Sequence, residues 1–175
     1  LWDGGITAWK GDVVEGESVQ ATDMLMDMAQ SAWEIGSPGV VFLDRCQQMS
    51  NTWYRSRVIG TNPCGEQPLP ENGCCNLGSI NLAAFWDEKQ GDIDLEELEG
   101  AVYGAVSFLD RVIDVSPGID GRIATEQAAC RRVGLGTMGL ADYLILMGIR
   151  YGSKASLDEI DRVYSEIARW AYEIS

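Results

Sequence analysis

The chain has 175 residues and no histidine. This absence excludes nucleophilic pairs of the Cys/His and Ser/His types, and it excludes zinc sites that use histidine ligands. A zinc site built from cysteine alone would need paired C-x-x-C spacings, and the five cysteines, at positions 46, 64, 74, 75 and 130, do not provide them. We therefore predict no metal ion held by the side chains of this chain.

Basic residues are few, with 13 Lys and Arg against 27 Asp and Glu and a formal net charge of −14. Such a chain repels phosphate backbones and anionic surfaces, so we expect no direct binding to DNA, RNA or a membrane. Most of the acidic side chains are interpreted as a solvated surface that favours solubility. A local basic cluster could still bind a small phosphate, so nucleotides are not excluded.

Long apolar runs are also absent, since the longest one, Tyr143 to Met147, is far too short to span a bilayer. No charged and then apolar leader opens the sequence, so we expect a cytoplasmic protein with reduced thiols rather than a disulfide framework. The opening from Leu1 to Ile6 lacks an initiator methionine and begins in mid-pattern. It suggests an excerpt of a longer polypeptide, although a processed terminus would look the same.

Apolar patterning predicts alternating strands and helices over a length that suits one domain. A β-branched and aromatic run predicts a buried strand over 38–43, and a second strand is expected over 76–85, before a turn at 87–92. Cys46, after the first strand, is interpreted as a small buried hydrophobe. This alternation favours an α/β fold.

Helices are predicted where apolar residues recur at three- and four-residue spacing. The first covers 18–35 and ends at Gly36. A long helix should follow an Asp94/Glu97 capping pair and end at Pro117 and Gly118, and a short one should run from about 124 to 132. The first helix should bury Leu25, Met28, Ala29, Ala32 and Trp33, and the long one Leu95, Leu98, Val102, Ala105, Val106, Leu109 and Ile113.

A last helix is predicted near the end of the chain. Its capping pair should be Ser156 and Glu159. The side chains expected to be buried on it are Leu157, Ile160, Val163, Tyr164 and Ile167.

The most unusual stretch is 61–82, TNPCGEQPLPENGCCNLGSINL, which holds three of the five cysteines and three of the five prolines. Proline restricts both its own φ and the residue before it, so the loop should be stiff and present Cys64 at a tip. If the tip is extended, side chains alternate, and Asn62, Cys64 and Glu66 point the same way. A thiol, a carboxylate and an amide would then converge on one small volume.

This stretch resembles the active-site loop of ribonucleotide reductase catalytic chains, in NPCGE at 62–66 and CNLGSINL at 75–82. A second block, RRVGLGTMGLAD at 131–142, also resembles the family. The lead-in, SNTWY at 50–54 followed by VIGT at 58–61, is most similar to the adenosylcobalamin-dependent branch, class II.

The resemblance covers most of residues 20–155. It implies that residues 1–175 are the middle portion of a single barrel domain, a ten-stranded α/β barrel, and that the active-site loop at about 61–82 is its central, cysteine-bearing finger. The barrel itself is implied by the resemblance, whereas the alternation of strands and helices is read from the sequence.

The resemblance also implies an enzyme that reduces ribonucleotides to 2′-deoxyribonucleotides for DNA precursor synthesis by a radical mechanism. Adenosylcobalamin would initiate the radical, and Cys64 would become the thiyl radical that abstracts the ribose 3′-hydrogen. Glu66 would be the general base for the 3′-hydroxyl, and Asn62 would hold the ribose hydroxyls. Cys75 would be one member of the reducing cysteine pair, with its partner in an upstream segment. Cys74 departs from the family pattern, so the assignment of Cys75 depends on its position before the NLGS sequence.

Partners and alternatives follow from the same resemblance. A thioredoxin or glutaredoxin-type protein would regenerate the dithiol, and a homodimer is an option for the assembly. One alternative is a class I catalytic chain that receives its radical from a partner subunit. Another is a non-catalytic nucleotide-binding fragment whose cysteines are structural and whose glycine turn holds a phosphate.

The glycine turn, GLGTMG at 134–139, matches G-x-G-x-x-G to the letter. A dinucleotide site would need a buried strand before the first glycine and an acidic residue about twenty positions after the motif, at the end of the next strand. The sequence offers neither in the right place. We therefore interpret the glycines as allowing close backbone packing where a strand passes into a helix over 140–147.

Overall fold

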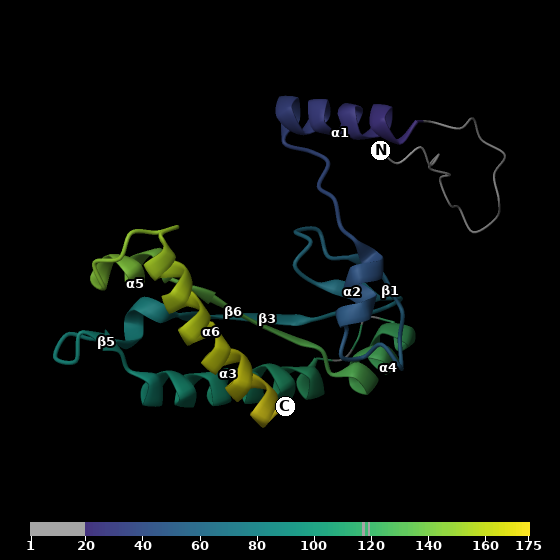
Figure 1. The fold of residues 1–175 in the computed structure, drawn as a ribbon. Helices are drawn as coiled ribbons and strands as arrows, with labels where there is room; N and C mark the ends of the chain where they lie inside the picture. Colours follow the sequence, from purple (N-terminus) through teal and green to yellow (C-terminus); the bar gives the residue numbers. More distant parts are fainter. Residues whose placement is uncertain (1–19, 117, 119) are drawn as a thin grey trace. The chain divides into compact units, whose positions relative to one another are not determined.

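A computed structural model describes residues 20–116, 118 and 120–175 (Figure 1). The chain divides into two compact units, Leu1–Phe42 and Leu43–Ser175. Within the described part, no helix is both long and apolar enough to cross a membrane.

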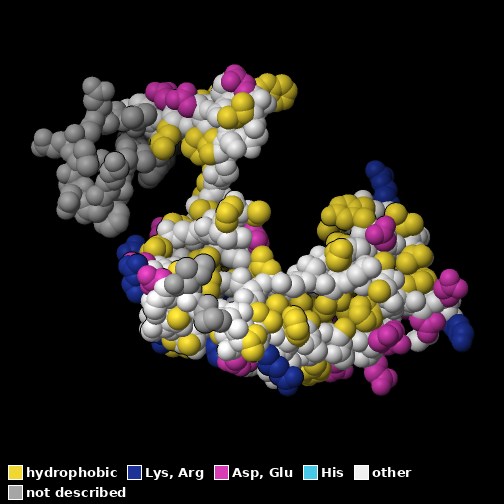
Figure 2. All heavy atoms as spheres, turned by 180° about the vertical axis from the view of Figure 1, so that it is seen from behind, with side chains coloured by type: hydrophobic (Ala, Val, Ile, Leu, Met, Phe, Trp, Pro, Cys, Tyr) yellow, Lys and Arg dark blue, Asp and Glu magenta, His cyan; other side chains and the backbone are white. Residues whose placement is uncertain are grey.

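The described part of the first unit is the helix α1, Ala21–Ile35, which ends where Gly36 adopts φ 77 and donates its N–H to the Ala32 carbonyl. The predicted helix is confirmed, but the predicted burial of its apolar stripe is wrong. Leu25 is 63% exposed and Trp33 87% exposed, and hydrophobic side chains stand at the surface of this helix in Figure 2. An amphipathic helix buries its stripe only against another element, and the described residues of this unit form no other.

The predicted strand over 38–43 is also wrong. Residues 37–42 form neither helix nor strand, and the helix α2, Leu43–Met49, begins where the strand should end. Val40 and Val41 are exposed. A continuous apolar run becomes a buried strand only when neighbouring strands and helices cover it, and the sequence of the run alone does not supply them. Cys46 lies on α2 and is half-buried rather than buried.

The second unit is organised around two parallel strands, β3 (Asn76–Asn81) and β6 (Val133–Met138). Their register runs without a break from Asn76 beside Val133 to Asn81 beside Met138. Parallel neighbours need a long crossover connection, which here contains the helix α3, Leu95–Val115. Figure 1 shows α3 beside this strand pair and the helix α6, Lys154–Ile174, lying across α3.

Helix α3 confirms the prediction made from its apolar spacing. Asp94 caps it by accepting a hydrogen bond from the Glu97 N–H at 3.0 Å, while the Asp94 N–H donates to the Phe85 carbonyl instead of to Glu97. The helix ends at Val115, before Gly118, and Pro117 lies outside the described residues. Its buried side chains are Leu98, Val102, Val106, Leu109 and Ile113, whereas Leu95 and Ala105, also predicted to be buried, are half-buried.

Three further helices complete this unit: α4 (Gly121–Cys130), α5 (Leu140–Leu146) and α6. The capping residue of α6 is Ser153, not Ser156 as predicted, because the Ser153 hydroxyl accepts from the Ser156 N–H at 3.2 Å. Ser156 is instead buried, with its hydroxyl donating to the Ser153 carbonyl at 2.8 Å. The predicted burial of Leu157 is wrong, because its exposed fraction is 61%, and Ile160 and Tyr164 are half-buried. Val163 and Ile167 are buried as predicted.

Short elements fill the connections. The strands β1 (Val58–Thr61) and β2 (Pro68–Pro70) form an antiparallel hairpin, and β4 (Trp86–Asp87) pairs with β5 (Asp92–Ile93) after the 3-10 turn η1, Leu82–Phe85. The predicted strand from Asn76 is therefore confirmed as far as Asn81. The mixed helix and strand content agrees with an α/β fold, and the strands among the described residues form two-stranded sheets without a closed barrel.

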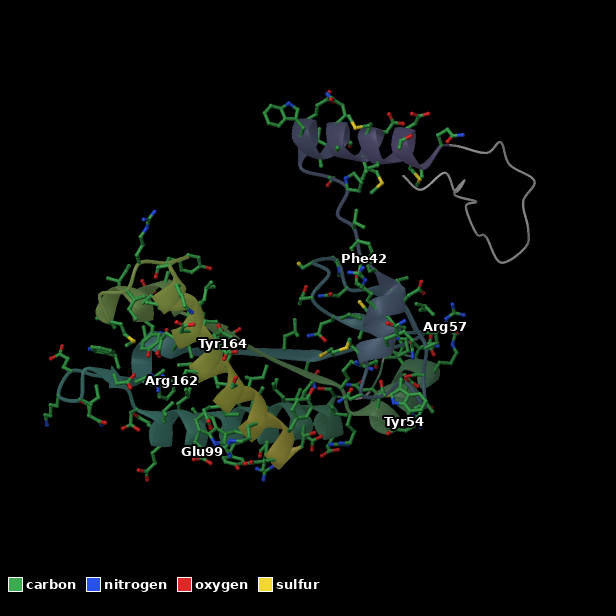
Figure 3. The ribbon with its side chains drawn as sticks, in the orientation of Figure 1. Phe42, Tyr54, Arg57, Glu99, Arg162 and Tyr164 are labelled. Carbon is green, nitrogen blue, oxygen red and sulfur yellow. The ribbon has the colours of Figure 1, made fainter. Side chains whose placement is uncertain are left out.

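Polar contacts fasten α6 to the rest of the unit (Figure 3). Arg162 donates from Nη2 to Asp92 Oδ1 at 2.6 Å, on β5, and to Glu159 Oε1 at 2.7 Å. Tyr143, on α5, donates its hydroxyl to the same Glu159 oxygen at 2.6 Å, and burial together with that carboxylate raises the pKa of Tyr143 well above its usual range. Tyr164 shares a hydrogen bond with Thr137 on β6. The bond to Thr137 ties α6 to β6, and the contacts of Arg162 and Glu159 tie α6 to β5 and α5.

Candidate active site

The tip of the β1–β2 hairpin is a tight turn over residues 62–67. The Asn62 N–H donates to the Gln67 carbonyl at 3.3 Å, and the Gly65 N–H donates to the Asn62 carbonyl at 3.0 Å, with Gly65 at φ 82. The turn is therefore folded rather than extended, so alternation along an extended chain does not describe it. Cys64 stands on this turn and is exposed, at the tip where the sequence places it.

Two of the predicted site residues meet across this turn. The side-chain amide of Asn62 donates from Nδ2 to Glu66 Oε1, and Asn62 Oδ1 accepts from the Gln67 N–H at 2.9 Å. Asn62 thus uses one side chain to close the turn and to orient the carboxylate of Glu66. Gln67, whose backbone completes this arrangement, is not among the site residues predicted from the sequence.

The strands β3 and β6 present two different faces. On the face toward α3, Asn76 donates from Nδ2 to the Leu109 carbonyl at 3.1 Å, Ile80 is buried, and a Cβ built on Gly78 would lie 3.5 Å from Leu109 Cδ1. The opposite face carries Leu77 and Ser79, which are exposed. Side chains alternate between the two faces with period two, so Cys75 belongs with Leu77 and Ser79.

Gly134 is the point where the hairpin, the strand pair and Cys75 meet. A Cβ built on Gly134 would lie 2.5 Å from Gln67 Nε2, 2.6 Å from Leu77 Cδ2 and 3.3 Å from Cys75 Sγ. Gly136, two residues on, faces Ser79, with 3.5 Å from its built Cβ to Ser79 Oγ. Both glycines lie inside β6, where their lack of a side chain lets the hairpin approach.

Cys75 immediately precedes β3 and is half-buried, and its thiol faces the Asn76 carbonyl at 3.5 Å. Burial raises the pKa of the Cys75 thiol, the positive charge of Arg132 opposes that rise, and the charges of Cys74 and Glu66 add to it. Burial alone raises the pKa of Cys74. The carboxylate of Glu66 on the hairpin tip therefore lies close enough to Cys75 to act on its thiol electrostatically.

Two consecutive arginines follow α4 and point to different partners. Arg131 adopts φ 45 and donates from Nε to Asp110 Oδ1 at 2.7 Å and from Nη1 to Asp114 Oδ1 at 2.9 Å, on α3. Arg132 donates from Nη2 to Thr52 Oγ1 at 2.9 Å. Thr52 belongs to the SNTWY lead-in, so this bond joins two of the segments that resemble the reductase family.

The other features of this unit are separate from the hairpin tip. Cys130 donates its thiol to Glu126 Oε1 at 2.7 Å and accepts from Arg55 Nε at 3.4 Å. A cavity of about 390 Å³ borders Thr52, Arg132 and α6, and no residue of the turn at 62–67 lines it. In the described part of the chain, no group of His, Cys, Asp and Glu side chains could hold a metal ion.

Comparison of the sequence with models of protein families shows which family the chain belongs to. Residues 7–175 match the model of the ribonucleotide reductase barrel domain. The chain belongs to the ribonucleotide reductase barrel-domain family. Both segments that carry the resemblance, the cysteine loop and the glycine block, fall within the matched range.

Curated members of the ribonucleotide reductase family give the same result. The chain is 39% identical over 155 residues to a vitamin B12-dependent ribonucleoside-diphosphate reductase of Mycobacterium tuberculosis (strain CDC 1551 / Oshkosh), covering 89% of this chain and 22% of that protein. Identity to the enzyme of that name from Thermoplasma acidophilum is 37% over 150 residues, covering 85% and 19%. A ribonucleoside-diphosphate reductase subunit alpha from Synechocystis sp. is 28% identical over 162 residues, covering 90% and 20%. The chain thus spans about a fifth of the length of these relatives.

Proposed function

We propose that this chain is the central part of the catalytic subunit of a ribonucleotide reductase, which converts ribonucleotides to 2′-deoxyribonucleotides for DNA synthesis. The observation that carries the proposal is the hairpin tip, where the exposed Cys64 stands between Asn62 and Glu66, themselves joined by a hydrogen bond. The arrangement places a thiol, a carboxylate and an amide on one short turn. A substrate ribose bound against the tip can meet all three groups.

In the proposed reaction Cys64, as a thiyl radical, takes the 3′-hydrogen of the ribose, and Glu66 accepts the proton of the 3′-hydroxyl. Asn62 has two tasks, because its amide both orients Glu66 and offers hydrogen bonds to the ribose hydroxyls. The 2′-hydroxyl then leaves as water. Cys75 and a second cysteine supply two electrons and two protons and become a disulfide, so that one ribonucleotide and two thiols give one deoxyribonucleotide, water and the disulfide.

Adenosylcobalamin is the initiator that we propose, because the relatives with 39% and 37% identity are named vitamin B12-dependent. When bound, this cofactor supplies the unpaired electron by homolysis of its cobalt–carbon bond. The chain fits such a cofactor in one respect: the exposed tip leaves the Cys64 sulfur accessible to a group bound outside the hairpin. We assign no residue of this chain to cofactor binding.

The same proposal extends to the architecture and the partners. We place the β3–β6 pair within a ten-stranded α/β barrel, residues 1–175 in the middle portion of its single domain, and the β1–β2 hairpin as its central finger. A thioredoxin or glutaredoxin-type reductant would restore the dithiol in the cytoplasm, and a homodimer is one option for the assembly. No direct contact with DNA, RNA or a membrane is proposed, since the net charge is −14.

One alternative, a class I chain that depends on a radical-bearing subunit, is favoured by the 28% identity to a reductase subunit alpha. The other alternative, a glycine turn that holds a phosphate, is disfavoured because the side chain of Gln67 already occupies the space beside Gly134.

The experiment supplies the purified full-length protein with adenosylcobalamin, a dithiol and ribonucleotides, and measures deoxyribonucleotide by chromatography. We expect product without any second protein, together with a change in the visible spectrum of the cofactor. Product that requires a separate metal-containing subunit, and that is indifferent to the cofactor, would assign the chain to class I. No product under either condition would contradict the proposed activity.

A further inference from the structure

Cys75 and Arg132 flank the start of the parallel β3–β6 ladder. The ladder begins with Asn76 beside Val133, and Cys75 and Arg132 immediately precede these two partners. Leu77 and Gly134 are also partners, and the Cys75 thiol lies beside them, since a Cβ built on Gly134 would be 3.3 Å from Cys75 Sγ. Neighbouring strands lie about 4.8 Å apart, so the backbones that carry Cys75 and Arg132 enter the ladder next to each other.

Separate contacts hold each of these side chains in place. Gly134 provides the space beside Cys75, since a Cβ there would lie 3.3 Å from Cys75 Sγ. The guanidinium of Arg132 is tethered to Thr52 Oγ1 at 2.9 Å, and both residues are half-buried. Arg131, which adopts φ 45, is held elsewhere by Asp110 and Asp114 on α3.

The charges that face Cys75 differ in sign. Arg132 is the cation that lowers the pKa of the thiol, whereas burial, Cys74 and Glu66 raise it. Because burial makes the largest contribution, the thiol is held above its ordinary pKa, and Arg132 offsets part of that rise. Arg132 has no corresponding effect on the adjacent Cys74, whose pKa is raised by burial alone.

We propose that Arg132 is a positioning residue for thiol–disulfide exchange at Cys75, where its guanidinium, tethered by Thr52, stabilises the thiolate as the enzyme disulfide is reduced. This inference rests on the proposed reductase function. It assigns a role to Arg132 in the segment 131–142, which resembles the reductase family. Such a role suits an arginine, because a guanidinium stays charged at every pH at which a thiol exchanges.

The exchange conserves electrons and protons. A thiolate of an external dithiol attacks the enzyme disulfide at the sulfur of the second cysteine, the S–S bond breaks, and Cys75 leaves as a thiolate beside Arg132. The other external thiolate then attacks the mixed disulfide and releases the second enzyme thiolate. Two electrons pass from the dithiol to the enzyme disulfide, the dithiol becomes a disulfide, and solvent protons complete the two enzyme thiols. A better stabilised leaving thiolate departs faster.

The first test measures the thiolate directly and needs no turnover. The full-length protein is reduced and alkylated with iodoacetamide from pH 6 to pH 10. It carries Cys74→Ser, so that Cys75 is the only cysteine on the proteolytic peptide that begins after Glu71. Proteolysis after Glu71 separates Cys75 from Cys64, and mass spectrometry gives the alkylation rate of Cys75 alone. We expect Arg132→Gln to slow this rate about fivefold at neutral pH, the effect of one nearby charge on a partly solvated group, and to leave the plateau rate at high pH unchanged.

Three matched variants separate charge from structure. Arg132→Lys should restore most of the rate, because it keeps the charge. Thr52→Val, which frees the guanidinium, should slow alkylation in the same direction and carries the test if Arg132→Gln does not fold. With Cys75→Ser in place of Cys74→Ser, the Arg132→Gln change should leave the alkylation of Cys74 unaltered. The inference would be overturned if Arg132→Gln left the pH profile of Cys75 alkylation unchanged. It would also be overturned if Arg132→Gln changed the alkylation rate of Cys74 by the same factor.

A second readout distinguishes this inference from the proposed function. Pre-reduced Arg132→Gln enzyme should form as much deoxyribonucleotide in its first turnover as the unmodified enzyme, but regenerate several-fold more slowly with limiting dithiol. An absence of product in the unmodified enzyme would contradict the proposed function and leave the alkylation result intact. Equal regeneration rates with and without Arg132 would contradict the role of Arg132 alone.

Discussion

Asn62 and Glu66 are joined by a side-chain hydrogen bond across the turn that carries Cys64. Asn62 also accepts from the Gln67 N–H at 2.9 Å, so the same side chain that orients the carboxylate closes the turn. The orientation of Glu66 and the shape of the tip are therefore coupled. A substitution at either position tests whether the turn only supports Cys64 or also takes part in proton transfer.

Glu66→Gln should abolish most of the activity while preserving the turn. Glutamine can keep the contact with Asn62 but cannot accept the 3′-hydroxyl proton, so we expect turnover to fall by about a hundredfold or more. The dissociation constant of the ribonucleotide, measured by equilibrium dialysis, should change little. Glu71→Gln, at an exposed carboxylate just after the hairpin, is the matched control and should leave turnover unchanged. Equal losses in both variants would remove the base role from Glu66.

Gly134→Ala should impair activity through the approach of the hairpin, whereas Gly136→Ala should not. The added methyl at position 134 would stand 2.6 Å from Leu77 Cδ2 and 2.5 Å from Gln67 Nε2, so both side chains must move and the hairpin tip with them. At position 136 the nearest atom is 3.5 Å away, an ordinary contact. Because the displaced atoms end flexible side chains, both variants should stay within about 1 kcal/mol of the parent stability. Turnover and thermal unfolding should be measured for both variants. Equal turnover of the Gly134→Ala and Gly136→Ala proteins would contradict the prediction.

The adjacent cysteines should behave differently. Cys75 shares the face of Leu77 with Gly134, so Cys75→Ser should allow at most one turnover per pre-reduced enzyme and then stop. Cys74→Ser should leave multiple turnover largely intact. Counting product per enzyme with and without added dithiol makes the distinction. A variant lacking Cys74 that stopped after one turnover would show that the reducing cysteine has been assigned one position too late.

The ion pair between Arg131 and Asp110 gives a pH-dependent contribution to stability. The hydrogen bond from Arg131 lowers the pKa of Asp110 from its ordinary value of 3.8, so the pair stabilises the folded state above that value. This contribution is lost as the pH falls through the lower, folded-state pKa. Asp110→Asn should therefore lower the unfolding midpoint at pH 7 and make no difference in strong acid. Asp110 is 46% exposed, so the effect at pH 7 should be below about 1 kcal/mol. A difference that persisted in strong acid would assign it to packing rather than charge.

Local signals were sufficient to predict α3 and part of the site. The apolar spacing from Leu98 to Ile113 and the cap at Asp94 lie within one segment, so no distant partner is needed to interpret them. The tip position of Cys64 follows in the same way from the prolines around it. The α6 cap was misplaced by one turn because Ser153 and Ser156 both have the capping side chain, and sequence alone does not rank them.

Features that depend on distant pairing were missed. The apolar run over 38–43 has the composition of a buried strand, but no described strand lies beside it. The proximity of Arg132 to Cys75 requires the parallel register of β3 and β6, which joins positions 57 residues apart. The contact of Gln67 with the space beside Gly134 depends on where the hairpin folds. The two-residue spacing of Gly134 and Gly136 puts both glycines on one face of a strand. Of the sequence signals, this spacing came closest to indicating the face of β6 that the hairpin approaches.

The most direct measurement is deoxyribonucleotide formation by the full-length protein carrying Cys64→Ser, assayed beside ribonucleotide binding. A hydroxyl cannot form the radical at comparable cost, so we expect no product above the background of an enzyme-free sample. Cys64 is exposed on its turn, so serine should fit there and the dissociation constant of the substrate should remain near that of the parent. Cys46→Ser, at a half-buried cysteine on α2, serves as the control and should retain turnover. Deoxyribonucleotide formed by the Cys64→Ser protein at a measurable fraction of the parent rate would contradict the central role of this thiol.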